Sequence, residues 1–147
     1  MTPTAPARPT GLPHAVFLQR VADEPATSPE VRLGPFLDRI AADQAAREVT
    51  TALALARHGA VLQGLRARLT IAADSLRIDR LEPDGWTPWK RWPGPADLAV
   101  AIEVSNPVVV FGPTGLGWGV SNTKVVLRRG SQVETITVSR LGRVKRW

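Results

Sequence analysis

The feature that most constrains the fold is a change of hydrophobic period at Gly64. Between Phe36 and Gln63 apolar residues recur every three or four positions, charged residues lie between them, and there is no proline. This period predicts one long helix over residues 36–63, with Gly64 favourable for ending it. From Leu65 onward apolar and polar residues alternate, and this period of two predicts β-strands.

The strand pattern continues almost to the C-terminus. Alternation predicts a β-hairpin from residues 65–72 and 76–80, and then strands over residues 100–104, 107–111, 124–128, 133–139 and 143–146. A helix followed by antiparallel strands is typical of the α+β class, in which the sheet buries one face on the helix. We expect the helix to contact the sheet through Val49, Leu53, Ala56 and Ala60.

Composition divides the chain at about Pro35. Seven of the thirteen prolines lie in the first 35 residues, which predicts a flexible proline-rich arm over 1–35 and a head domain over 36–147, with its sheet over about 65–146. No stretch approaches the ~18 consecutive apolar residues of a spanning helix, and the start lacks the pattern of a secretory signal. The chain has no cysteine, which excludes disulfides.

The formal net charge of +6 lies entirely in residues 121–147. This segment has seven basic residues and one acid, Glu134, whereas the preceding 120 residues hold twelve of each sign. Concentrated positive charge predicts an anionic partner, nucleic acid before acidic lipid. The alternative is a solubilising surface that contacts nothing. The candidate DNA-binding residues are Arg143, Lys145 and Arg146, with Arg140, Arg128, Arg129 and Lys124 adding outer attraction.

Other polar residues favour structural roles. His14 and His58 have no cysteine partners and fit no zinc-site spacing. The acids between residues 74 and 84 flank a hairpin, where carboxylates usually form turns or pair with arginine. The glycines between residues 112 and 119 lack a phosphate-loop motif. We therefore expect no enzymatic activity, no cofactor or metal, and no small-molecule substrate.

A tryptophan-rich segment allows two interpretations. Trp86, Trp89 and Trp92 are interleaved with Lys and Arg in a proline-bounded loop over residues 84–94. Aromatic side chains beside cations can stack on unpaired bases. The alternative is that one or two of them fill the gap between sheet and helix, where a tryptophan buries ~150 to 250 Å².

Three segments resemble a known family. Residues 56–64, Ala-Arg-His-Gly-Ala-Val-Leu-Gln-Gly, are similar to the end of the long helix in minor pilins and pseudopilins of the GspH/FimT type. Residues 111–115, Phe-Gly-Pro-Thr-Gly, resemble the mid-domain turn of that family, and residues 133–145 resemble its closing strand and Gly-Arg ending. The resemblance covers residues ~45 to 147 in the family's order.

The resemblance implies a helix that continues from the membrane into a head of antiparallel sheets, in a type IV pilus or a type II secretion pseudopilus. It implies other minor pilins or pseudopilins as partners, and an extracytoplasmic location that is inner-membrane-anchored or pilus-associated. The family's leader and its apolar start of about twenty residues have no counterpart in this sequence.

The resemblance also implies two alternative functions. In FimT-like members a C-terminal Gly-Arg-x-Arg stretch is associated with DNA binding in natural transformation, and here it reads Gly142-Arg143-Val144-Lys145. Lysine keeps the charge and loses the planar fork of arginine, so we expect non-specific phosphate contacts. The alternative is a GspH-like structural subunit that primes assembly of the filament without nucleic acid.

Overall fold

The long helix begins earlier than predicted. The computed structural model describes residues 29–119 and 122–147, and in it helix α2 spans Pro29–Gln63. A proline at the first helical position costs no hydrogen bond, and Pro35 removes one bond inside the helix without ending it. The predicted arm over 1–35 lies mostly outside the described residues. Within the described part of the chain, no helix has both the length and the apolar character needed to cross a membrane.

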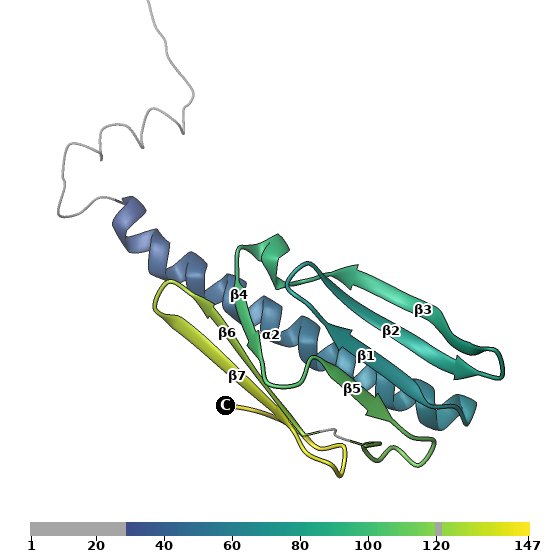
Figure 1. The fold of residues 1–147 in the computed structure, drawn as a ribbon. Coiled ribbons are helices and arrows are strands. Elements are labelled where there is room, and N and C mark those ends of the chain that lie inside the picture. The colour runs from purple at the N-terminus through teal and green to yellow at the C-terminus, as the bar shows by residue number, and fades with distance from the viewer. Residues whose placement is uncertain (1–28, 120–121) are drawn as a thin grey trace, which may run out of the picture. The chain divides into compact units, whose positions relative to one another are not determined.

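The compact unit from Asp38 to Trp147 contains two antiparallel sheets of four strands, and α2 runs along both (Figure 1). The first sheet has the order β3-β2-β1-β5, with β1 at Ala67–Ile71, β2 at Ser75–Glu82, β3 at Gly85–Pro93 and β5 at Val108–Phe111. The second has the order β4-β6-β7-β8, with β4 at Ala101–Val104, β6 at Thr123–Arg129, β7 at Gln132–Val138 and β8 at Val144–Arg146. A short 3-10 helix, η2 at Pro95–Leu98, joins the sheets. The predicted α+β architecture is confirmed.

The predicted helix face forms the centre of the core. Val49, Leu53, Ala56 and Ala60 are all 0% exposed. Both sheets pack on this face, the first through Leu69, Ile78 and Phe111 and the second through Val125, Leu127 and Ile136. Fully burying an aliphatic side chain of this size stabilises the fold by about 1.5 to 3 kcal/mol, so the alternating strands and the helix stabilise one another.

The tryptophan-rich segment is a strand rather than the predicted loop. β3 pairs with β2, and the register shifts between Ile78 and Asp79, which leaves Trp89 as the extra residue of a bulge. An edge strand with a bulge tolerates proline, which explains why Pro88 does not break it. A Cβ added to Gly59 of α2 would lie 2.8 Å from the Trp89 ring. Trp89 packs against the core together with Trp92, which confirms the structural interpretation for these two residues.

Candidate nucleic-acid interface

A junction of two buried glycines fixes the place where the last strand, β8, begins. Arg57 of α2 donates a hydrogen bond from Nε to the carbonyl oxygen of Gly115 at 2.9 Å. A Cβ added to Gly142 would lie 2.5 Å from the same carbonyl oxygen and 3.1 Å from Arg57 Nε. Gly142 also has a left-handed backbone, with φ of 80°. The three segments that resemble the family in sequence therefore meet at one point in the fold.

The turn before this junction positions Arg143. The backbone N–H of Gly142 donates to the carbonyl of Ser139 at 2.9 Å, and the N–H of Ser139 donates to the carbonyl of Arg143 at 2.9 Å. Ser139 Oγ accepts a further bond from the N–H of Arg143 at 3.2 Å. A turn with these bonds has a defined backbone, so Arg143 enters β8 at a fixed place.

Strand alternation then divides the basic residues between the two faces of the second sheet. β6 buries residues 123, 125 and 127, which face the core, and turns its even-numbered residues outward. Lys124 is paired with Thr137, and Thr137 with Lys145, so these three lie in one row across the outer face. Arg146 is paired with buried Ile136 and therefore belongs to the inner face.

Arg129 also belongs to the inner face, and we call it and Arg146 the inner pair. Arg129 donates from Nε to Asp38 Oδ1 at 2.9 Å and from Nη1 to the carbonyl of Leu98 at 3.0 Å. It joins the end of β6 to helix α2 and to η2. An arginine with a carboxylate and a backbone carbonyl as partners has a structural role.

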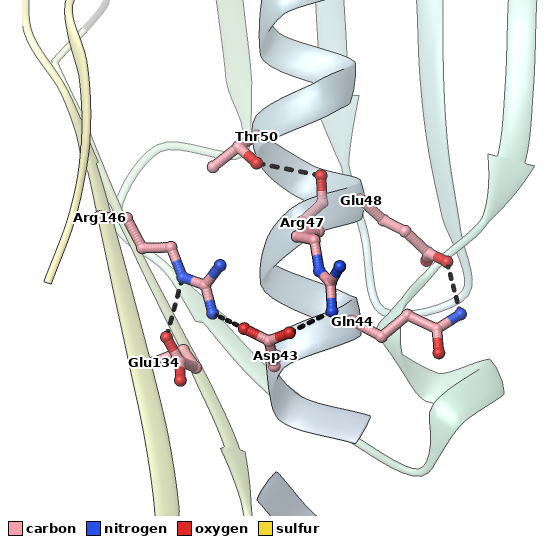
Figure 2. Close-up of polar contacts among 7 residues, drawn as sticks. All are labelled: Asp43, Gln44, Arg47, Glu48, Thr50, Glu134 and Arg146. Carbon is pink, nitrogen blue, oxygen red and sulfur yellow. Dashed lines mark hydrogen bonds and ion pairs between the residues drawn. The ribbon is translucent and has the colours of Figure 1, made fainter. Parts of the chain in front are cut away.

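Arg146 bridges two acids, as Figure 2 shows. It donates from Nη2 to Asp43 Oδ1 on α2 and from Nε to Glu134 Oε1 at 3.0 Å. Asp43 also accepts a hydrogen bond from Arg47, one helical turn further on. The bond from Arg146, followed by the bond from Arg47, lowers the pKa of Asp43. The bond to Asp43, followed by the bond to Glu134, raises the pKa of Arg146. Both groups are therefore charged at neutral pH and hold β8 against the helix.

The outer face carries a basic groove of about 610 Å³. Lys124, Arg143 and Lys145 are exposed and line it, and no carboxylate is among the described residues of its lining. The remaining lining comes from the hydroxyl groups of Ser105, Thr137 and Ser139 and from Asn122, Thr123, Val138 and Leu141. Thr123 is buried, and its hydroxyl already donates to the carbonyl of Asn106 at 2.8 Å. Ammonium, guanidinium and hydroxyl groups all donate hydrogen bonds to phosphate oxygens. We call this site the outer groove.

Trp147 lies at the edge of the outer groove. Its Nε1 donates to Thr137 Oγ1 at 3.2 Å, and Lys145 Nζ lies 3.8 Å from its ring centroid. These contacts place Trp147 on the same outer face as Lys145, although 66% of it remains exposed. The cation–π contact limits the positions of the lysine without neutralising its charge.

The other two predicted cations are peripheral. Arg128 is exposed on the outer face and lies 3.8 Å from Glu103, an exposed pair that adds little stability. Arg140 is exposed in the turn before Gly142. The structure thus brings Lys124, Arg143 and Lys145 together and gives Arg129 and Arg146 internal partners.

Two features of these surfaces are only weakly indicated by the sequence. The hydroxyl groups of the outer groove come from separate strands, and only the pairing of those strands brings them together. A second basic groove lies on the first sheet, where Arg68 and Arg77 both contact Asp79. Its sequence signal was the alternation of arginine with apolar residues before and within β1 and β2.

The remaining candidates for chemistry stay apart. Asp79 is buried and paired with arginine, whereas Asp74 and Asp84 are exposed. His58 is exposed on α2, and His14 lies outside the described residues. In residues 29–119 and 122–147, no three His, Asp or Glu side chains are grouped so that they could hold a metal ion.

Solved structures share this fold. The type IV minor pilin FimU of Pseudomonas aeruginosa superposes with a TM-score of 0.63 at 18% sequence identity, covering 76% of this chain and 91% of that one. The minor pseudopilin EpsH from the type 2 secretion system of Vibrio cholerae superposes with a TM-score of 0.59 at 16% identity, covering 72% of this chain and 95% of that one. No curated protein matches the sequence.

The family assignment comes from the sequence itself. The family model for the type II transport protein GspH matches residues 45–142, which is more than half of the chain. This range includes Arg57, Gly115 and Gly142, the residues of the glycine junction. The chain therefore belongs to the GspH family and is a minor pilin or pseudopilin of that type.

Proposed function

We propose that this chain is the head of a minor pilin that binds duplex DNA non-specifically through the outer groove, for DNA uptake in natural transformation by a type IV pilus. The observation that carries the proposal is the grouping of Lys124, Arg143 and Lys145 in a groove that no described carboxylate lines. Glu103, the acid that shares a neighbouring hollow with Lys124, does not line this groove. Three cations that outnumber nearby acids in this way attract a polyanion and gain by releasing its condensed counterions.

The chemistry of the outer groove favours phosphate over bases. Lysine ammonium groups are point charges on flexible stems, and hydroxyl groups accept and donate without preference for one base edge. Contacts of this kind hold the DNA backbone and carry no sequence information. The single arginine of the groove, Arg143, lies immediately before β8 and can add one bidentate phosphate contact.

The seven predicted cations therefore contribute unequally. Phosphate is bound by the three cations of the outer groove, Lys124, Arg143 and Lys145. Longer-range attraction comes from Arg128 and Arg140, which lie outside the groove. Arg129 and Arg146 hold the head together and contribute charge to the field without direct contact, because their donors already have carboxylate partners.

The test measures the affinity for duplex DNA as a function of salt concentration. Each phosphate contact contributes about −0.9 to the slope of log affinity against log salt, so three contacts give about −2.7. The triple variant Lys124→Gln, Arg143→Gln and Lys145→Gln should lose most binding and most of this slope. The control is the triple variant Arg20→Gln, Arg32→Gln and Arg39→Gln, which removes equal charge elsewhere and should bind like the wild type. Equal binding by the two variants would contradict the proposal.

A structural role is the alternative. The ion pairs of Arg129 and Arg146 with Asp38 and Asp43 favour this alternative, because these two basic residues stabilise the fold of the head. In that role the protein acts as a minor pseudopilin that primes assembly with other minor pilins or pseudopilins, in an extracytoplasmic filament. Absence of any shift of duplex DNA by the wild-type protein at low salt would select this alternative.

A further inference from the structure

The second basic groove, on the outer face of the first sheet, has a different composition. Its volume is about 510 Å³, and we call it the first-sheet groove. Four cations line it, Arg68, Arg77, Lys90 and Arg91, against one carboxylate, Asp79. Trp86 and Trp89 also line it, and of the two Trp89 packs against the hydrophobic core. Cations and aromatic rings therefore face one hollow.

The carboxylate anchors two of the cations. Asp79 is 3% exposed, and one of its oxygens accepts bonds from Arg68 Nη2 at 2.9 Å and from Arg77 Nε at 3.4 Å. One negative charge thus fixes two guanidinium groups and neutralises only one of them. In the described part of the chain, the two Nη groups of Arg77 have no hydrogen-bond partner. They are free to bind an anion.

The aromatic ring is also held in place. The guanidinium carbon of Arg68 lies 4.3 Å from the centroid of the Trp86 ring, and Trp86 is only partly buried. Arg66, two residues before Arg68, makes the same type of contact: its guanidinium carbon lies 3.7 Å from the ring centroid of Trp118. Arg66, just before β1, and Arg68, within it, are two positions apart, and each therefore lies against a tryptophan on the same side of the chain.

We propose that the first-sheet groove binds single-stranded nucleic acid, with one base stacked on Trp86 and the flanking phosphates bound by Arg77, Lys90 and Arg91. Proteins that bind single strands without sequence preference combine aromatic side chains, on which bases stack, with a positively charged groove that follows the backbone. The outer groove differs because it presents lysines and hydroxyl groups. The two sites therefore prefer different forms of nucleic acid, and this proposal does not depend on binding at the outer groove.

The aromatic ring distinguishes this ligand from others. Bases in a duplex are already stacked, so Trp86 adds nothing to duplex binding. An acidic protein segment needs the cations and gains no stacking from the ring. The proposal therefore requires that affinity depend on the presence of bases and on the ring of Trp86.

The experiment uses the full chain with Lys124→Gln, Arg143→Gln and Lys145→Gln, so that the outer groove does not contribute. Fluorescence anisotropy compares an oligo(dT) of about twelve nucleotides, within the usual site size, with an abasic strand of equal length and charge. Loss of one stacked base corresponds to about 5- to 150-fold, so oligo(dT) should bind that much more tightly. Trp86→Ala should abolish the difference, whereas Trp86→Phe and the control Trp147→Ala should preserve it.

Several results would overturn the proposal. Equal affinity for oligo(dT) and the abasic strand would show attraction by charge alone, and this comparison remains decisive if Trp86→Ala does not fold. Equal affinity for polyglutamate would identify an acidic protein segment as the ligand. The double variant Lys90→Gln and Arg91→Gln, at two exposed positions, should weaken binding of both strands, and unchanged affinity would exclude this groove. Failure of the outer groove to bind duplex DNA would leave these results unaffected.

Discussion

The two faces of the second sheet carry the same kind of side chain and use it differently. On the inner face, Arg129 and Arg146 lie opposite carboxylates of α2 and form ion pairs. On the outer face, Lys124 and Lys145 lie in one row and line a groove that no described carboxylate lines. Adjacent residues, such as Lys145 and Arg146, thus have separate roles. Charged residues that are close in sequence form one surface only if strand alternation places them on the same face of the sheet.

The largest loss of stability is expected at Gly142, because it fixes the start of β8, which carries residues of both faces of the second sheet. Gly142→Ala forces a side chain against the carbonyl of Gly115 and against Arg57, at a φ that disfavours any Cβ. Backbone strain and overpacking each cost about 1 to 3 kcal/mol, so unfolding in urea should show a loss of about 3 kcal/mol. Displacement of β8 should weaken both the inner ion pairs and DNA binding.

The matched control is Gly64→Ala. Gly64 also has a left-handed φ of 66°, but nothing lies within 4 Å of the added Cβ. Strain alone remains, and we expect a loss of about 1 kcal/mol. An equal loss at both glycines would show that the junction of Gly142, Gly115 and Arg57 has no special role in positioning the tail.

A second prediction compares two neighbours at the end of β6. Arg129→Gln leaves the partly buried Asp38 and the carbonyl of Leu98 without their donor, which should cost about 1 to 3 kcal/mol of unfolding free energy. Arg128→Gln changes an exposed residue of the outer face and should alter stability by no more than ~0.5 kcal/mol. Urea titration of the two variants measures the difference. Similar losses would mean that the two faces do not differ as described.

A third prediction concerns acid. The hydrogen bonds from Arg146 and Arg47 lower the pKa of Asp43 in the folded state, so its contribution to stability is complete above its unfolded pKa and is lost as the pH falls through the folded pKa. The wild type should therefore be more stable than Asp43→Asn above about pH 5, and the difference should shrink at lower pH. Urea unfolding from neutral to acid pH measures this. If the difference in unfolding free energy between wild type and Asp43→Asn grew toward low pH, Asp43 would not be stabilised in its charged form by Arg146 and Arg47.

Local patterns predicted much of the fold. The 3.6-residue period identified the buried helix face at Val49 and Leu53, and the period of two identified most strands, because both follow from burial of one face. The segments around Arg57, Gly115 and Gly142 were identified by resemblance, but their contact was not, since it joins residues far apart in the chain.

Two aspects needed the folded structure. β3 was missed because its prolines usually end a strand, and the bulge at Trp89 that accommodates them depends on pairing with β2. The division of the basic residues between two faces was not predicted. The sequence shows which residues of a strand share a face, but long-range packing decides which face lies opposite Asp38 and Asp43. The sequence predicts a contact of Arg146 with DNA, and no observation tests it. Because Arg146 already has two carboxylate partners, we propose Lys124 as the phosphate ligand in its place.

The central claim is that strand alternation divides the basic tail into an inner structural half and an outer binding half. Its most direct test is the salt dependence of duplex DNA affinity for two single variants at adjacent positions, Lys145→Gln and Arg146→Gln, which remove the same charge. Lys145→Gln should reduce the slope of log affinity against log salt by about 0.9, the value for one phosphate contact. Arg146→Gln removes no phosphate contact, so it should leave the slope unchanged, while it lowers the free energy of unfolding. An equal reduction of the slope in both variants would contradict the division.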